Sequence, residues 1–281
     1  MKYALIALDV DGTLVGPDSA LPRETARAVR DVRAAGLRVC LATGRSYAET
    51  IGIWRQLRLD APYEPLVLIG GAMVSRPDTG DTLRSRAMGR DLAYRFADAL
   101  AGHGLSAMAI VDGRRCDVDY YLAESGDVHA AQREWFSKMD VRLRRVPRLA
   151  DARDMPDPLR ISAVAAEDRA GRVAQELKVA FDGLLEVRAI LAPNYGVTIV
   201  EAFAAGVDKF AAVAGVARDY GIAASGIVAV GDDINDLGMI RGAGLGVAVS
   251  HAAEPLRAAA DVVAAEPLPA LLRRIAAGEL G

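Results

Sequence analysis

The segment YALIALDVDGT, residues 3–13, decides the fold class of this 281-residue chain. Residues 3–8 form a short, continuously apolar run, which is typical of a parallel β-strand buried on both faces. Asp9, Asp11 and Gly12 follow at once, so the strand must end in a polar loop. The sequence therefore predicts a buried strand with two carboxylates at its carboxyl end.

The residues that follow predict a β-α-β unit. Helical spacing over 21–35 begins near Pro22 and stops before Gly36, and residues 37–42 then predict a second strand. The other elements expected in this α/β part are a helix over 47–57, a strand over 66–69, a helix over 209–220, a strand over 227–230, a helix ending near 241 and a strand over 245–249.

Three polar residues follow predicted strands of this α/β part. Asp9, Thr43 and Asp232 each come directly after a strand or within one residue of its end. In open α/β sheets, ligands bind outside the carboxyl ends of the strands. The sequence therefore predicts that these three side chains share one site.

The middle of the chain has a different pattern. Asp112-Gly113 between the segments 106–111 and 114–118 predicts a β-hairpin. The other elements expected here are a strand over 159–165, a helix over 168–181, and strands over 184–190 and 197–202 on either side of a turn at 193–196. We expect a doubly wound, Rossmann-like parallel-sheet core of residues 1–82 and 204–281, with an α+β domain of residues 83–203 inserted into it.

Composition excludes several classes of function. The formal net charge is -3, so no basic excess is available to neutralise a nucleic-acid backbone. No apolar run reaches the length of a membrane span, and we expect a cytoplasmic protein. Cys40 and Cys116 lack the spacing of a disulfide framework or a zinc site. Composition predicts no particular oligomeric state.

Asp9 and Asp11 alone leave two interpretations open. Carboxylates two residues apart at a strand end suit metal binding, or a division of labour between a nucleophile and an acid/base. The alternative is a solvated Asp-Gly turn. Other segments of the chain decide between the two.

Four segments, in order, resemble the four signatures of the haloacid dehalogenase superfamily. They are Asp9 to Leu14, Thr43 to Arg45, Gly206 to Lys209, and Gly231 to Asp236. Met239 and the strand 244–249 further resemble the Cof-type branch of that superfamily. The resemblance implies that residues 83–203 form the large α/β cap of this branch, which serves substrate recognition.

The resemblance also implies a catalytic set. Asp9 would attack phosphorus and become an aspartyl phosphate, and Asp11 would act as general acid and then as general base. Mg²⁺ would be held by the Asp9 carboxylate, the Asp11 backbone carbonyl and the Asp232 carboxylate. Asp236 is expected to be a supporting carboxylate, with direct coordination as the alternative.

The remaining site residues follow from the second to fourth signatures. The resemblance implies that Thr43 and Lys209 stabilise the transferring phosphoryl group, and that Gly44 and Asn235 contribute to its binding. Taken alone, Lys209 would be a surface lysine and Thr43 a helix cap. Arg45 either contacts substrate or only anchors its loop.

Two positions depart from the branch. Gly70 and His251 stand where the branch usually has Asn, which leaves their roles open. A separate group of arginines forms either a solvated strand face or a patch that attracts anions; it comprises Arg142, Arg144, Arg145 and Arg148.

The function expected from these motifs is Mg²⁺-dependent hydrolysis of small phosphomonoesters, such as sugar phosphates or similar metabolites. A phosphomutase of the same superfamily is the nearest alternative. A noncatalytic sensor of phosphorylated metabolites is the alternative from another class, although Asp9, Asp11 and Lys209 are all present.

Overall fold

The computed structural model describes residues 2–192 and 196–280. The chain divides into two compact units. Unit 1 comprises Met1–Leu83 and Asp208–Gly281, and unit 2 comprises Arg84–Val207. The insertion predicted from the sequence spans 83–203. Within the described ranges, no helix combines the length and the apolar character that a membrane span requires.

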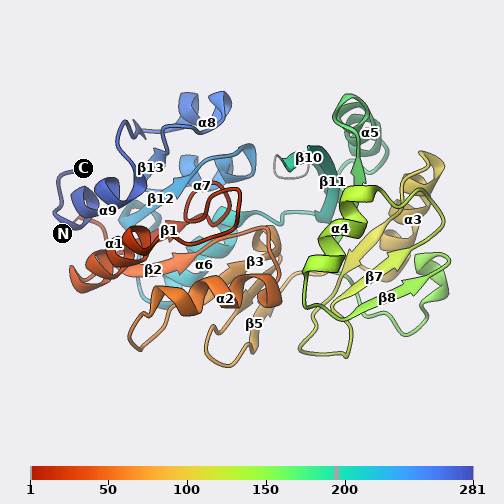
Figure 1. The fold of residues 1–281 in the computed structure, drawn as a ribbon, viewed down its shortest axis with the longest axis horizontal. Coiled ribbons are helices and arrows are strands. Elements are labelled where there is room, and N and C mark those ends of the chain that lie inside the picture. The colour runs from red at the N-terminus through yellow and green to blue at the C-terminus, as the bar shows by residue number, and fades with distance from the viewer. Residues whose placement is uncertain (1, 193–195, 281) are drawn as a thin grey trace. The chain divides into compact units, whose positions relative to one another are not determined.

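Unit 1 is built on a parallel sheet (Figure 1). Its strands, in spatial order, are β14 (Val262–Val263), β13 (Leu245–Ala248), β12 (Ile227–Gly231), β1 (Leu5–Leu8) and β2 (Arg38–Leu41). Every residue of β1 is completely buried, as its unbroken apolar sequence predicts. The chain leaves β1 toward β2 on one side and returns at β12 on the other, so the topological switch point lies between β1 and β12.

Six α-helices in the described part of unit 1 pack around this sheet in two groups. They are α1 (Arg23–Ala34), α2 (Tyr47–Leu57), α6 (Lys209–Asp219), α7 (Leu237–Gly242), α8 (Glu254–Ala259) and α9 (Leu268–Ala276). Helix α1 packs against α9 and α2, whereas α6 packs against α7. The predicted doubly wound α/β core is therefore confirmed.

The strand predicted over 66–69 has a different environment from the one expected. It forms β3 (Leu66–Leu68), which pairs with β4 (Met73–Ser75) in an antiparallel sheet that also contains β5 (Thr82–Ser85). A single parallel bridge between Ala42 and Val67 connects β3 to the end of β2. The central sheet thus continues past β2 for one residue pair only.

Unit 2 is an α+β module around a second sheet. Its strands, in spatial order, are β10 (Leu185–Ala192), β11 (Val197–Ala204), β9 (Arg160–Ala165), β6 (Met108–Ile110), β7 (Tyr120–Ala123) and β8 (Leu143–Val146), and its helices are α3 (Arg90–Gly102), α4 (Ala130–Lys138) and α5 (Glu167–Ala180). Helices α3 and α5 bury one sheet face, where Phe96 and Phe181 meet edge to face at 5.2 Å. The predicted turn at 193–196 includes residues 193–195, which lie outside the described residues.

The predicted hairpin at Asp112-Gly113 is wrong in its second strand. Residues 114–118 form turns, because Asp112 accepts hydrogen bonds from Arg114 N through its carboxylate and from Arg115 N through its carbonyl. The partner of β6 is β7, whose four residues are all buried. The stronger apolar run, not the one nearest the turn, therefore forms the strand.

Burial of β2 generates a prediction about thiol chemistry. Cys40 is completely buried and donates a hydrogen bond to the Pro65 carbonyl at 3.3 Å. Burial, together with the charge of Glu64, raises the pKa of Cys40 to about 12. Because the thiolate is the reactive form, we expect Cys40 to resist a thiol reagent at pH 8 until the protein unfolds.

The half-buried Cys116 provides the control for this titration. In a Cys116→Ser variant, a colorimetric thiol assay should show no fast reaction in buffer and one thiol after addition of denaturant. A fast reaction of this variant in buffer would contradict the burial of β2.

Candidate active site

The switch point of the central sheet brings two of the predicted carboxylates together. Asp9 directly follows β1 and Asp232 directly follows β12. These strands pair in parallel with Leu8 opposite Val230, and Asp9 N donates to the Val230 carbonyl at 3.0 Å. The sheet register therefore places Asp9 and Asp232 side by side, although they are far apart in sequence.

Lys209 is the buried cation of this site. Its Nζ lies 2.6 Å from Asp9 Oδ1 and 2.6 Å from Asp236 Oδ1, and its side chain is only 1% exposed. It is the first residue of α6, whose N-cap Asp208 accepts a hydrogen bond from Ala211 N at 3.0 Å. A buried ammonium is costly unless it is paired, so the two carboxylates account for its burial.

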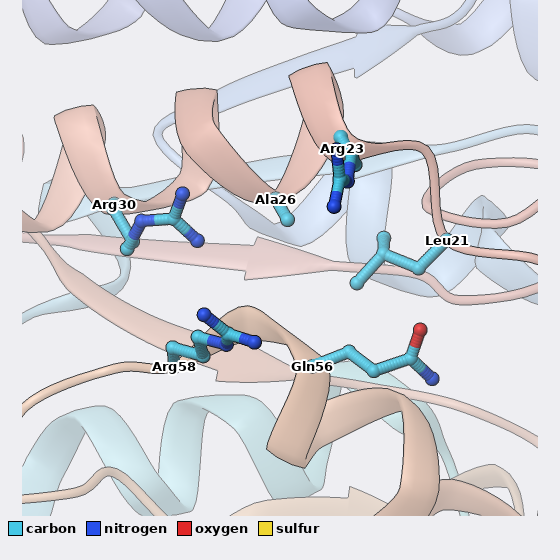
Figure 2. Close-up of a pocket in the computed structure, with 6 residues that line it drawn as sticks. All are labelled: Leu21, Arg23, Ala26, Arg30, Gln56 and Arg58. Carbon is cyan, nitrogen blue, oxygen red and sulfur yellow. The ribbon is translucent and has the colours of Figure 1, made fainter.

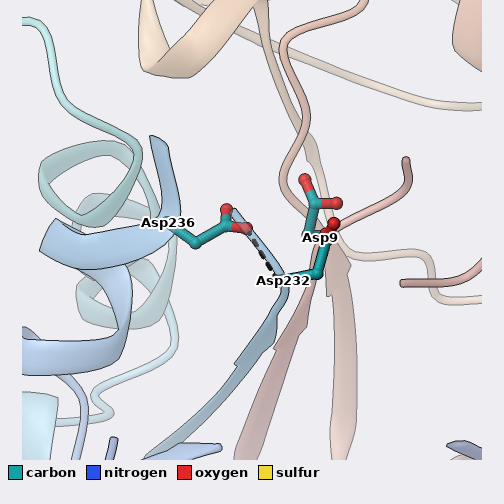
Figure 3. A group of neighbouring side chains, drawn as sticks. All are labelled: Asp9, Asp232 and Asp236. Carbon is teal, nitrogen blue, oxygen red and sulfur yellow. Dashed lines mark hydrogen bonds between the residues drawn. The ribbon is translucent and has the colours of Figure 1, made fainter. Parts of the chain in front are cut away.

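Three carboxylates lie close together at this site (Figure 3). Oxygens of Asp9, Asp232 and Asp236 lie within 4.8 Å of one another. Burial, then the charge of Asp236, raises the pKa of Asp9 well above its ordinary value and raises that of Asp232 to about 6. Burial would lower the pKa of Lys209, but Asp236 and Asp9 outweigh it and raise that pKa. The site therefore carries an excess of negative charge that one ammonium does not balance.

The oxygens of these carboxylates are not equally available. Asp236 Oδ1 accepts from Lys209, while Oδ2 accepts from the backbone N–H groups of Asp232 at 3.2 Å and Asp233 at 3.3 Å. Asp232 Oδ1 accepts from the Thr13 hydroxyl at 3.0 Å. The second oxygens of Asp9 and Asp232 have no hydrogen-bond partner among residues 2–192 and 196–280. A hard cation with oxygen ligands fits the open Asp232 oxygen beside the Asp9 carboxylate, whereas both oxygens of Asp236 are already engaged.

Gly12 is required by the close approach of Asp232. Its φ of +76° is in the left-handed region, and a Cβ at this position would lie 2.1 Å from Asp232 Oδ2. Any larger residue would displace a carboxylate oxygen of the site. Gly12 thus keeps open the space between the loops after β1 and β12.

Thr43 and Arg45 occupy the end of β2. Thr43 is completely buried, and its Oγ1 accepts a hydrogen bond from Arg45 N at 3.1 Å, which leaves its hydroxyl proton available. Gly44, between them, is half-buried. The backbone therefore holds the Thr43 hydroxyl at the edge of the sheet where Asp9 and Asp232 also lie.

The structure separates Asp11 from the three crowded carboxylates. Arg45 donates to both oxygens of Asp11, from Nε at 2.9 Å and from Nη2 at 2.5 Å, and Nη2 also donates to Ser19 Oγ at 2.9 Å. Burial would lower the pKa of Arg45, but the hydrogen bonds and charge of Asp11 raise it. The Asp11 side chain is 51% exposed. This pair connects the loop after β2 to the loop after β1, and a contact of Arg45 with substrate stays a prediction.

Asn235 and His251 complete the surroundings. The Asn235 side chain has a buried Oδ1 without a hydrogen-bond partner in the described part of the chain, and this oxygen can only accept. His251 Nε2 lies 2.7 Å from the Gly12 carbonyl, and this nitrogen must carry a proton because the carbonyl can only accept. His251 therefore ties the loop after β13 to the loop that follows Asp9.

Sequence reasoning did not predict three of these contacts, which are made by Thr13, Ser19 and His251. Thr13 lies inside the first signature, so the sequence pointed to its position. Nothing in the sequence predicted its hydrogen bond to Asp232. Ser19 and His251 carry no motif that identifies their partners. Their contacts depend on how separate loops meet at the edge of the sheet.

Comparisons with known proteins agree with this geometry. A family model for haloacid dehalogenase-like hydrolases matches residues 6–267. The chain is 24% identical to the 5-amino-6-(5-phospho-D-ribitylamino)uracil phosphatase YitU of Bacillus subtilis, over 92% of this chain and 91% of that protein. It is 22% identical to the pyridoxal phosphate phosphatase YbhA of Escherichia coli, over 94% and 93%.

Solved structures share the fold. A haloacid dehalogenase-like hydrolase from Bacteroides thetaiotaomicron superposes with a TM-score of 0.76 at 22% identity, covering 98% of this chain and 100% of that one. A subclass IIB sugar phosphatase gives a TM-score of 0.76 at 20% identity, covering 97% and 98%. Since the family model spans nearly the whole sequence, the chain belongs to the haloacid dehalogenase-like hydrolases.

Proposed function

We propose that this protein is a Mg²⁺-dependent phosphatase that hydrolyses small phosphomonoesters through an aspartyl phosphate on Asp9. The observation that carries the proposal is the state of the Asp9 carboxylate. Lys209 holds Oδ1 at 2.6 Å, while Oδ2 has no protein partner among the described residues. One oxygen is thus anchored and the other is available to attack at the switch point of the sheet.

The covalent step uses Asp9 as nucleophile. Its Oδ2 forms a bond to phosphorus as the bond between phosphorus and the leaving oxygen breaks, which gives an acyl phosphate and an alcohol. Lys209 offsets negative charge on Asp9 Oδ1 during this transfer. Attack of water on the acyl phosphate then releases inorganic phosphate and restores the carboxylate.

Mg²⁺ fits the donor set on chemical grounds. The Asp9 and Asp232 carboxylates and the Asp11 backbone carbonyl would hold it, and Asp236 would support the site through Lys209. When bound, Mg²⁺ offsets the repulsion between these carboxylates and the phosphate ester. The pKa values of Asp9 and Asp232, both raised by burial and then by the charge of Asp236, support a need for added positive charge.

Four residues would hold the phosphoryl group. The Thr43 hydroxyl has a free proton to donate, and the Lys209 ammonium lies beside the nucleophile. Gly44 offers backbone without a side chain, and Asn235 would donate from its amide nitrogen, because its unpartnered Oδ1 can only accept. These groups are fixed by the backbone before substrate arrives, so they need little reorganisation.

Asp11 would serve as general acid for the leaving group and as general base for water. In the structure its carboxylate is paired with Arg45 and is about half exposed, so it must turn from that pairing to reach the reacting oxygens. Arg45 would then act as the anchor from which Asp11 moves.

We propose that unit 2 selects the substrate. The named relatives include phosphatases of a phosphoribitylaminouracil and of pyridoxal phosphate, and a structural neighbour is a sugar phosphatase. These names support a small phosphorylated metabolite as the substrate of this chain. We place that metabolite in the cytoplasm, and a net charge of -3 argues against nucleic acid as the substrate.

The first prediction concerns the nucleophile. Asp9→Asn should lower phosphate release from a panel of phosphorylated metabolites by more than about 10⁴-fold, because an amide cannot form the acyl phosphate. The fold should survive, because Asp236 still pairs with Lys209 and the amide oxygen of the variant can still accept from its Nζ; circular dichroism checks this.

The matched control is Asp60→Asn, which makes the same change at an exposed position. It should keep the activity of the parent protein. Near-parental activity of Asp9→Asn would refute the covalent mechanism.

The second prediction concerns the metal. EDTA should abolish turnover and Mg²⁺ should restore it, whereas Ca²⁺ should support it poorly because it is larger and less strictly octahedral. Asp232→Asn should raise the Mg²⁺ concentration for half-maximal activity by about tenfold or more, and by more than Asp236→Asn does. Full turnover in EDTA, or a larger effect of Asp236→Asn, would contradict this ligand assignment.

The third prediction concerns proton transfer. Asp11→Asn should slow the burst of alcohol release more for alkyl phosphates than for activated aryl phosphates, because only poor leaving groups need a proton. The burst is measured by rapid quench, since the second step also uses Asp11. Equal slowing for both leaving groups would leave Asp11 without its acid role.

A further inference from the structure

A second concave site lies in unit 1, outside the catalytic residues. It is an open hollow of about 350 Å³ beside helices α1 and α2. Its lining residues are Leu21, Arg23, Ala26, Arg30, Gln56 and Arg58. Figure 2 shows the guanidinium groups of Arg23, Arg30 and Arg58 around this space. None of the residues assigned to phosphoryl transfer lines it.

The sequence builds this pocket from two helices. Arg23, Ala26 and Arg30 are spaced as i, i+3 and i+7, so they share one face of α1. Ala26 is small and leaves a hollow between the two longer side chains. Gln56 and Arg58 come from the carboxyl end of α2. Arg30 is fixed there because its Nη1 donates to the Leu57 carbonyl at 3.0 Å.

The three guanidinium groups have no carboxylate partners in the described part of the chain. The arginines of the 142–148 segment differ, since each of them pairs with an acidic residue: Arg142 with Asp119, Arg144 with Asp154, Arg145 with Glu124 and Arg148 with Asp98. Those pairs support the solvated strand face, not an anion patch. In a chain of net charge -3, unbalanced positive charge thus gathers at the pocket.

Arg58 has a backbone conformation that glycine would adopt more easily. It ends α2 in the left-handed region, with φ 52° and ψ 48°. Glycine is the usual residue at such a helix end, because it has no Cβ to clash. Arg58 thus places a long cationic side chain at a position where the backbone favours glycine. This side chain lines the pocket.

We propose that this pocket binds a small anion carrying at least two phosphate groups. Guanidinium groups bind phosphate oxygens in bidentate pairs, and three of them exceed what a single phosphate needs. The volume is within the range of small-molecule sites, and Gln56 adds an amide for a neutral part of the ligand. The site would act apart from catalysis and does not rest on the proposed function.

The test uses inorganic pyrophosphate as probe with the full-length protein. Isothermal titration in EDTA at 150 mM salt removes the metal from the catalytic carboxylates and screens weak surface attraction. We expect saturable binding, at least about tenfold tighter than that of inorganic phosphate. Arg23→Gln and Arg58→Gly should each weaken pyrophosphate binding by about tenfold or more.

Arg58→Gly separates binding from folding, because glycine adopts the left-handed conformation without strain. Its melting temperature should equal or exceed that of the parent while its affinity falls. Arg27→Gln is the matched control, since Arg27 is exposed on α1 and does not line the pocket. It should change the affinity by less than about twofold.

Four results would overturn the proposal. They are no binding of pyrophosphate by the parent protein, equal affinity for phosphate and pyrophosphate, an equal loss in Arg27→Gln, and a loss in Asp9→Asn instead of the pocket variants. The last result would place the probe at the catalytic carboxylates. If the pocket binds pyrophosphate but Asp9→Asn keeps full turnover, the proposed function fails and the pocket proposal stands.

Discussion

The buried contact of Lys209 with Asp9 and Asp236 is the interaction on which the rest of the site depends. An ammonium that is 1% exposed can exist there only because two carboxylates lie 2.6 Å away. Those carboxylates in turn come from the loops after β1 and β12, so the ion pairs fix the spacing of the two loops. Asp236 also accepts a hydrogen bond from the backbone N–H of Asp232. The ion pair with Lys209 therefore also helps to fix the position of Asp232.

A turn with three successive positive φ values lies beside this cluster. Ile69, Gly70 and Gly71 have φ values of 51°, 63° and 100° in succession, and a Cβ on Gly71 would lie 2.3 Å from the Asp208 carbonyl oxygen. The turn after β3 thus packs directly on the residue before Lys209. Asn and Gly both accept the left-handed conformation, so Gly70 fits the φ of 63° found here without the side chain that Asn would bring.

Sequence reasoning predicted the parts of the structure that depend on local pattern. Apolar runs that end in Asp9 and Asp232 placed both residues at one edge of a parallel sheet, and that fold is confirmed. The pairing of Arg45 with Asp11 could not be predicted, because it depends on side-chain directions in two loops. The strand expected over 114–118 failed because the better apolar segment lay further from the turn.

The pairing of β1 with β12 has a consequence for the order in which the protein acquires structure during translation. Leu5 pairs with Ile227, and all of unit 2 is synthesised between these two strands. Strand β1 therefore keeps one edge unpaired until unit 2 and β12 have been made. Unit 2 is contiguous in sequence, so it can complete its own sheet before β12 is available to pair with β1.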